Sequence, residues 1–149
     1  MKKVAVLMGS ANDRAKMAPA LEILESFGVE ATEHVMSAHR SPAVVAAFAS
    51  SARDEDYGAI ICGAGMAAHL AGAVAGQTTL PVIGVPLSGG AIGGIDSLYA
   101  TVQMPRGIPV ATVAIDGAAN AALLAVEMFA ITDVDLQKRL ADYRAEWSK

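Results

Sequence analysis

The sequence is poor in cysteine, which limits how the chain can be held together. Cys62 is the single cysteine among 149 residues, so no disulfide can form within the chain. With three scattered histidines it lacks the ligand spacing of a zinc site, and we expect neither a metal nor metal-dependent chemistry. Stability must come from a buried core, and the chain is long enough for one domain, residues 1–149, to form it.

Long apolar runs and an excess of positive charge are also absent. No stretch approaches the roughly 20 apolar residues that a membrane-spanning helix needs, and the apolar start at residues 4–8 is too short for the core of a signal peptide. The net charge of −4 offers no basic surface for nucleic acid. We therefore expect a soluble, cytoplasmic protein whose partners are neither membranes nor nucleic acids.

Charged residues are scarce as well. They make up 17% of the chain, below the roughly 25% that is usual for soluble domains, whereas hydrophobic residues make up 54%. Part of this apolar surface is expected to lie between the subunits of an oligomer.

What the chain does contain is a regular alternation of two kinds of segment. Short β-branched apolar runs alternate with Ala-rich stretches of helical period, which is typical of βαβ units and a parallel sheet. We predict strands at residues 3–8, 31–36, 59–62, 82–85 and 110–114, with the second and most polar strand at an edge. The predicted fold class is α/β, a three-layer doubly wound parallel sheet, in which ligands bind beyond the carboxyl ends of the strands.

Helices are predicted between the strands and at the end of the chain. The first begins after Asn12 or Asp13 and ends before Gly28, and the second has Ser41 as N-cap and Pro42 at its first position. The remaining helices are predicted at residues 67–76, 94–102, 118–131 and 133–147. The strand set is complete before the last of them, so this extra C-terminal helix is expected to pack against the domain or a partner subunit.

The loop after the first strand combines a glycine with polar side chains at the start of a helix. Gly9 permits close approach of a ligand to the backbone, and Ser10, Asn12 and Asp13 offer hydrogen-bonding groups. A helix N-terminus favours an anion, so a phosphate fits here. The alternative is that Asn12 or Asp13 only caps the helix, and the two roles are compatible.

The loop after the second strand places a histidine beside an arginine. In the segment Ser37-Ala38-His39-Arg40, the Arg40 guanidinium can donate two hydrogen bonds to a phosphate, and a neutral His39 can move a proton near pH 7. Taken alone, such a segment is more often an ordinary surface loop.

The loop after the third strand carries glycines and a second histidine. Residues 63–68 match a dinucleotide-binding fingerprint, but that pattern normally opens the first βαβ unit and is followed by an acidic residue at the end of the next strand, which is missing here. Gly65 still allows a ligand to lie against the backbone. His69 is a candidate for binding rather than for catalysis.

All three loops follow parallel strands at their carboxyl ends, so they are expected to meet in one crevice. A glycine-rich run at residues 88–94 is long enough to be a mobile active-site loop. His34, inside a strand, is expected to be structural or exposed, and Cys62, in an apolar run, is expected to be a small buried hydrophobic residue. The loops contain no paired carboxylates, nucleophilic cysteine or P-loop lysine.

Two other classes of protein with this kind of sheet fit the loops less well. A flavodoxin-like nucleotide-binding module or electron carrier needs a run of Ser and Thr hydroxyls after the first strand. A phosphoryl receiver needs acidic residues after the first and third strands. The chain has Met-Gly-Ser at residues 8–10 and Cys-Gly-Ala at residues 62–64, and both sets favour an enzyme over these modules.

The sequence resembles the PurE family over nearly its whole length. The resemblance rests on the motifs at residues 8–10, 37–40 and 63–70, and on segments in the same order at 81–86, 96–98, 102–105 and 120–125. It implies a flavodoxin-like fold and a homo-octamer whose active sites are shared between neighbouring subunits.

The resemblance also implies an activity in purine biosynthesis. The expected enzyme is a mutase that moves a carboxylate from the exocyclic nitrogen of a phosphorylated aminoimidazole nucleotide to ring carbon C4, without a cofactor. His39 matches the general acid/base of the family. The substrate-binding residues that the resemblance implies are Ser10, Asp13, Ser37, Arg40, Gly65, Ala67 and His69.

The chain departs from the family pattern at particular positions. Asn12 replaces a serine of the phosphate loop, and Met66 and Ala71 replace a glycine and a proline in the loop expected to enclose CO2. A sister branch of the family carboxylates aminoimidazole ribonucleotide directly with CO2. It usually has lysine in place of Arg40 and lacks the Ala-Ala-His-Leu segment found here at residues 67–70, so direct carboxylation is the alternative and the mutase is favoured.

Overall fold

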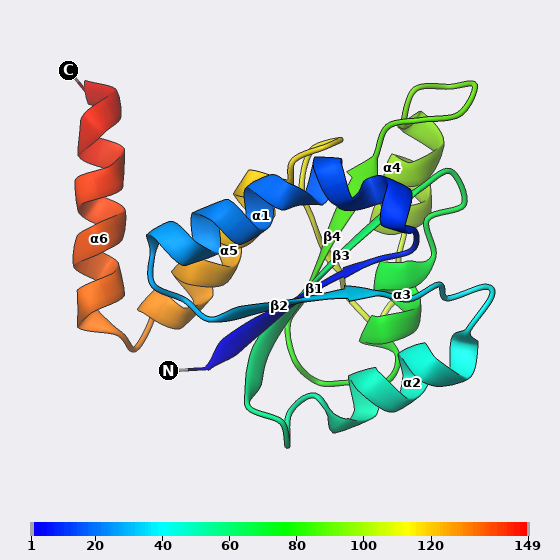
Figure 1. Ribbon diagram of the computed structural model, residues 1–149, viewed down its shortest axis with the longest axis horizontal. Coiled ribbons are helices and arrows are strands. Elements are labelled where there is room, and N and C mark those ends of the chain that lie inside the picture. Colours follow the sequence, from blue (N-terminus) through cyan, green and yellow to red (C-terminus); the bar gives the residue numbers. More distant parts are fainter. Residues whose placement is uncertain (1, 149) are drawn as a thin grey trace.

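A parallel sheet forms the centre of the structure, a computed structural model that describes residues 2–148 (Figure 1). Its strands are β1 (Lys3–Met8), β2 (Ala31–Val35), β3 (Tyr57–Gly65), β4 (Val82–Leu87) and β5 (Ala111–Thr112). Their order is β2-β1-β3-β4-β5, and every neighbouring pair is parallel. The predicted doubly wound α/β fold is confirmed, with β2 at an edge.

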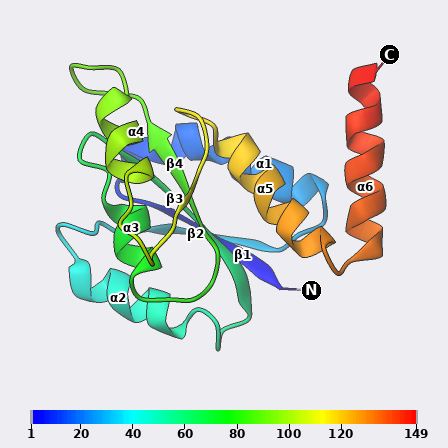
Figure 2. The ribbon, with the colours of Figure 1, turned by 180° about the vertical axis from the view of Figure 1, so that it is seen from behind.

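Helices cover both faces of the sheet (Figures 1 and 2). The short 3-10 helix η1 (Ala11–Asp13) leads into α1 (Arg14–Ser26), which lies beside α5 (Ala118–Ala130) on one face. The other face is covered by α2 (Pro42–Ser51), α3 (Leu70–Ala75) and α4 (Ile95–Val102). The chain ends in α6 (Val134–Ala145) and the 3-10 helix η2 (Glu146–Ser148).

The central strands are apolar throughout because both of their faces are buried. In β1, Val4, Val6 and Met8 join the core beneath α1 and α5, whereas Ala5 and Leu7 join the core beneath α2 and α3. Successive side chains of a strand point to opposite faces, so a strand between two helical layers needs apolar residues at every position. This explains why the sequence shows continuous apolar runs.

Four strands differ in length from the prediction: β2 is one residue shorter and β4 two residues longer, and the differences in β3 and β5 are larger. β3 runs from Tyr57 to Gly65 instead of residues 59–62, because its glycines continue the ladder and reach as far as Leu87 of β4. Hydrophobic periodicity overlooks such glycines, since they contribute no side chain. β5 has two residues rather than five and pairs on one side only, as expected for the second edge of the sheet.

The third helix begins later than predicted, at Leu70 rather than residue 67. Met66, the residue before the predicted start, has a left-handed φ of 50°, so the chain does not enter the helix directly from β3. The N–H groups of Ala68 and His69 instead donate to carbonyls two residues back, at 2.8 and 2.9 Å. Ala67 and His69 therefore lie before the helix, in the loop that faces the carboxyl edge of the sheet.

The extra C-terminal helix packs against the domain with part of its apolar side. Leu136 is buried, and Leu140 and Tyr143 pack partly against the core, whereas Val134 and Trp147 are 73% and 79% exposed. α6 lies at the end of the molecule away from α2 and α3 (Figure 2). Among residues 2–148, no helix is long and apolar enough to cross a membrane.

We expect Leu24→Ala to lower the free energy of unfolding by about 2–5 kcal/mol, because it leaves a cavity in a close-packed core. Leu24 is fully buried on α1. Urea unfolding followed by circular dichroism measures the change. Val44→Ala is the control, since this side chain is 55% exposed, and it should change the free energy by less than about 0.5 kcal/mol. Equal losses in the two variants would contradict the assigned core.

Candidate active site

Three loops meet at the carboxyl edge because the strands before them are neighbours in parallel register. β1 lies between β2 and β3. At its end the N–H of Met36 donates to the carbonyl of Met8 (2.9 Å), and the N–H of Gly9 donates to the carbonyl of Gly63 (3.3 Å). The chain leaves β1 toward β2 on one side and later returns as β3 on the other, so the loops diverge and leave a hollow above β1.

This hollow has a volume of about 390 Å³ and is lined by all three loops. Its lining residues are Gly9, Ser10, Asn12, Asp13, Ser37, Ala38, His39, Arg40, Ala64, Gly65, Met66, Ala67, His69 and Leu70. All eight residues that the sequence nominated are among them. The predicted convergence of the loops is therefore seen in the structure.

The two histidines of the hollow form a direct pair. His39 Nε2 and His69 Nδ1 are 2.7 Å apart, and the rings meet edge to face with their centroids 4.8 Å apart. One nitrogen must donate and the other accept, so this contact requires that at least one of the facing nitrogens carries no proton. The loop after β3 thus holds the imidazole supplied by the loop after β2.

Ser37 shapes the loop that carries the arginine. Its Oγ accepts a hydrogen bond from the backbone N–H of Arg40 at 3.1 Å, which closes a tight turn. The side chain of Arg40 is exposed at the hollow, and its guanidinium has no hydrogen-bond or ion-pair partner within residues 2–148. It is therefore a cation available to an anionic ligand.

Ser10 and Asp13 present oxygen atoms at the start of the first helical turn. Ser10 Oγ accepts from the N–H of Asn12 at 3.2 Å, so this serine caps the short 3-10 helix η1. Asp13 precedes α1 but makes no side-chain capping bond, which leaves its carboxylate for other partners. Partial burial raises the pKa of Asp13, and the charge of Lys16 and a hydrogen bond from the Ser10 backbone oppose that rise.

Met66 is the unusual residue of the hollow. It is 60% exposed although apolar, and its φ of 50° lies in the left-handed region. That conformation costs a residue with a side chain roughly 1–2 kcal/mol, whereas glycine adopts it freely. The chain thus keeps an exposed, strained methionine where a glycine would fit.

A polar cluster that sequence reasoning missed lies beside the hollow. Lys16 Nζ donates to the carbonyl and to the Oγ of Ser88, the latter at 2.9 Å. Ser88 in turn donates through its N–H (2.8 Å) and its hydroxyl to the carboxylate of Asp116. The cluster fixes the first residue of the glycine-rich loop at 88–94. Asp116 follows the fifth strand at the same edge of the sheet, and this position is the feature of the sequence that could have identified it as a candidate.

The Asp116 carboxylate is ionised when it holds this cluster together. Burial by itself would raise the pKa of Asp116, but the two hydrogen bonds from Ser88 and the charge of Lys16 outweigh it and lower the pKa. The contribution of these bonds to stability is thus complete above the ordinary aspartate pKa. It is lost only as the pH falls through the lowered value of the folded protein.

The other candidate side chains lie away from the hollow. His34 Nε2 is 2.8 Å from Thr32 Oγ1 and its ring packs on Phe48, and burial lowers the pKa of His34. Cys62 is buried in the core beneath α2 and α3, which raises the pKa of its thiol. The surroundings of both residues agree with the structural roles expected from the sequence.

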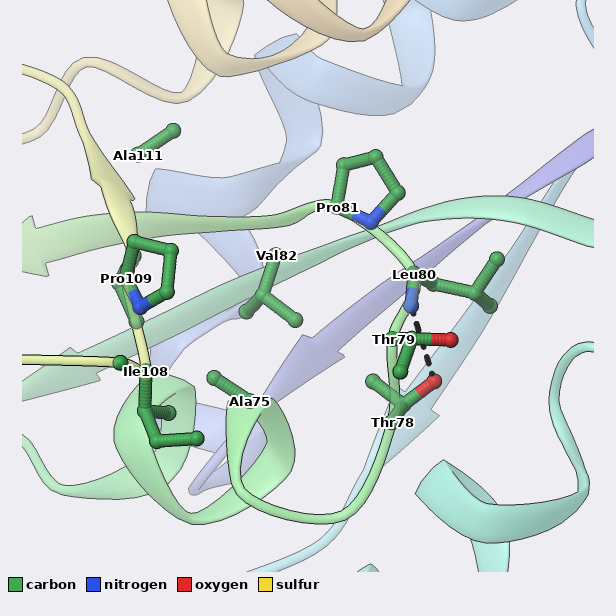
Figure 3. Close-up of a pocket in the computed structure, with 11 residues that line it drawn as sticks. Ala75, Thr78, Thr79, Leu80, Pro81, Val82, Ile108, Pro109 and Ala111 are labelled. Carbon is green, nitrogen blue, oxygen red and sulfur yellow. Dashed lines mark hydrogen bonds between the residues drawn. The ribbon is translucent and has the colours of Figure 1, made fainter.

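A larger hollow of about 510 Å³ lies at the opposite edge, where β4 and β5 begin (Figure 3). Its walls are mainly apolar, with Ile108 and Pro109 on one side and the hydroxyl-bearing residues Thr78 and Thr79 on the other. Thr78 Oγ1 is already engaged by the N–H of Leu80 at 3.2 Å. None of the described residues that line it is ionisable, so it offers no acid/base group and no charge for a phosphate.

Known proteins share both the sequence and the fold. A family model described as AIR carboxylase matches residues 3–149. The N5-carboxyaminoimidazole ribonucleotide mutase of Escherichia coli (strain K12) is 52% identical over 144 residues, which cover 95% of this chain and 85% of that protein. The mutase of the same name from Pyrococcus abyssi (strain GE5 / Orsay) is 47% identical over 149 residues, covering 100% and 86%. A crystal structure of Treponema denticola PurE has a TM-score of 0.89 at 28% identity, covering 97% of this chain and 90% of that one.

We expect loss of the Asp116 carboxylate to loosen the start of the loop at 88–94. Asp116→Asn keeps an acceptor for the Ser88 N–H but not for its hydroxyl, and Asp116→Gly removes both. Asparagine and glycine tolerate the φ of 57° at this position, so the backbone is preserved. Hydrogen exchange of the Ser88 amide, followed by NMR, should be faster in the Asn variant than in the wild type and fastest in the Gly variant. An unchanged rate in Asp116→Gly is the result that contradicts this anchoring.

Proposed function

Because the chain belongs to the AIR carboxylase family, we propose that it is an N5-carboxyaminoimidazole ribonucleotide mutase, an isomerase of purine biosynthesis. The observation that carries this conclusion is the identity of about half of its residues with enzymes of that name over nearly the whole chain. The reaction moves a carboxylate within one nucleotide, from the exocyclic nitrogen to ring carbon C4. The hollow supports it by bringing an imidazole pair, a guanidinium and hydroxyl groups together.

The phosphate of the nucleotide is assigned to Ser10, Ser37 and Arg40. Each serine Oγ already accepts one backbone N–H, so its own hydroxyl hydrogen remains to be donated to a phosphate oxygen. The Arg40 guanidinium can add two parallel hydrogen bonds. The carboxylate of Asp13, on the same loop as Ser10, is suited to accept from the ribose hydroxyls.

The base and the carboxylate are assigned to the loop after β3. Gly65 and Ala67 have little or no side chain, so a flat imidazole ring can lie close to the backbone there. His69 borders the same space and holds His39 through the 2.7 Å contact. In this proposal the imidazole ring of the substrate lies between the phosphate-binding residues and His39.

The reaction needs one proton shuttle and no cofactor. The carbamate C–N bond breaks, its electron pair stays on nitrogen, nitrogen takes a proton from His39, and CO2 is set free. The electron-rich C4 then bonds to CO2, and the neutral His39 removes the proton that C4 carried. Substrate and product are isomers, so the protein contributes positioning, exclusion of water and this proton transfer.

The pairing of the histidines favours this use of His39. Its Nε2 is engaged with His69, and its Nδ1 has no hydrogen-bond partner within the described part of the chain. The free nitrogen can exchange a proton with the substrate while His69 keeps the ring oriented. In this scheme His39 is the catalytic residue and His69 binds the substrate and positions His39.

We also propose that the protein works as a cytoplasmic homo-octamer with active sites shared between subunits. The exposed apolar side chains at the C-terminal end support an assembly, because Ile131, Val134 and Trp147 are 77%, 73% and 79% exposed. Large apolar side chains exposed to this degree are typical of subunit contacts.

The activity is tested by offering the purified protein two substrates separately. The carbamate nucleotide alone should be converted rapidly to the C4-carboxylated nucleotide, whereas aminoimidazole ribonucleotide with bicarbonate should react slowly. The opposite preference would identify the direct carboxylase of the sister branch, and no conversion in either assay would exclude both.

His39→Asn should lower turnover of the carbamate nucleotide by roughly 10²–10⁴-fold, the usual contribution of a positioned acid/base, with nucleotide binding retained. His34→Asn is the matched control, since His34 contacts Thr32 and Phe48 rather than the hollow, and it should keep its turnover. Steady-state rates and a nucleotide-binding titration measure both effects. Undiminished turnover in the His39 variant would refute the mechanism.

Sedimentation equilibrium tests the assembly. We expect an oligomer at micromolar concentration, because the apolar surface around α6 would otherwise face water. Trp147→Glu places a charge on that surface and should shift the equilibrium toward smaller species. A wild-type protein that sediments as a monomer while fully active would be incompatible with shared active sites.

A further inference from the structure

Met66 lies between the hollow and the glycine-rich loop at 88–94. Its side chain lines the hollow and is 60% exposed. On its other side it meets the loop at Gly90, where an added methyl group would lie 3.1 Å from Met66 Cγ and 3.3 Å from Sδ. Gly90 has a φ of 63°, so both its conformation and its close approach to Met66 favour glycine.

The loop that Met66 contacts is held at both of its ends. At the start, Ser88 is bonded to Lys16 and Asp116. At the end, Gly94 packs so closely on Ile115 that an added methyl group would lie 2.8 Å from its side chain. The middle of the loop is therefore presented to Met66 by contacts that lie outside the hollow.

We infer that Met66 is a positioning residue of the carboxylate transfer, which closes the hollow toward the 88–94 loop and keeps the freed CO2 beside C4. This inference rests on the proposed mutase function. Once the carbamate C–N bond breaks, CO2 either bonds to C4 or escapes to water, and only the first outcome completes the isomerisation. To favour bonding to C4, the wall around CO2 must be apolar and must leave no gap through which CO2 can leave or water can enter.

The chemistry of the side chain fits this task. A thioether carries no hydrogen-bonding group strong enough to hold water at the wall, and its unbranched chain adapts to an irregular gap between two loops. A methionine that only filled the core would be buried and relaxed. Met66 is instead exposed to the hollow and strained, which is the usual signature of a residue retained at a functional site.

The experiment measures how much carboxylate is retained in one turnover. The carbamate nucleotide is labelled at its carboxylate carbon and mixed with the full-length enzyme in unlabelled bicarbonate, with carbonic anhydrase present to equilibrate any escaped CO2. The fraction of consumed substrate that becomes labelled C4-carboxylated product is the readout. Spontaneous breakdown without enzyme is subtracted.

Three substitutions separate the size of the wall from its polarity. Met66→Gly relieves the backbone strain and opens the wall, and it should cause a several-fold loss of retained label, with aminoimidazole ribonucleotide released instead. Met66→Gln keeps the length of the side chain but adds an amide, and its retained fraction of label should lie between those of Met66→Gly and the wild type. Met66→Leu keeps an apolar wall and should retain most of the label. Met128→Leu, on α5 and packed against the core, is the matched methionine control and should behave as wild type.

The results distinguish this inference from the function on which it rests. If the wild type does not convert the labelled nucleotide at all, the proposed mutase activity is wrong. If the wild type converts it but Met66→Gly retains as much label, or only turns over more slowly with the same retained fraction, the role of Met66 is overturned. Thermal unfolding of each variant confirms folding, and Met66→Gly should be no less stable than wild type because glycine suits the left-handed φ.

Discussion

The parallel register of β1 between β2 and β3 is the constraint on which the site depends. The carbonyl of Met8 receives the N–H of Met36, and the carbonyl of Gly63 receives the N–H of Gly9, so the loops after β2 and β3 each start one strand spacing from the loop after β1. A slip of one residue would turn the core-facing side chains of β1 to the wrong layer. The same hydrogen bonds that keep Val6 and Leu7 buried therefore also bring the serines, the arginine and the histidines together.

Close packing on one face of the sheet links the core to the hollow. Gly63 has no side chain, and a methyl group there would lie 2.3 Å from Met17 Sδ. The first turns of α1 can consequently lie close above β3, which carries Asp13 to the hollow and Lys16 to Ser88. A larger residue at position 63 would force the buried Met17 side chain out of its place beneath α1. Gly63 therefore gives Met17 the room to pack between β3 and the helix that follows Asp13.

The order of elements and the meeting of the eight nominated residues in one hollow could be predicted because they depend on local rules. Apolar runs identify buried strands, and the carboxyl edge of a parallel sheet collects the loops that follow them. The bounds of β3 and α3 could not, since glycines leave no periodicity and the left-handed φ of Met66 has no sequence signature. The contacts between His39 and His69, and among Lys16, Ser88 and Asp116, join residues from separate elements. Convergence places such groups near one another but does not determine which atoms meet.

The two sides of the hollow are stabilised by different contacts, and this difference is relevant to the reaction. The side formed by the loops after β1 and β2 is tied down by backbone and serine hydrogen bonds, so it suits the phosphate and ribose, which do not change during turnover. The side toward β4 is closed by Met66 against a glycine-rich loop anchored from outside the hollow. In the proposed reaction the group bound there changes from carbamate to CO2 to carboxylate, so the wall must adapt without admitting water. A flexible thioether meeting a glycine can adjust in this way. The left-handed backbone of Met66 costs roughly 1–2 kcal/mol, which is about the energy equivalent of a tenfold change in rate.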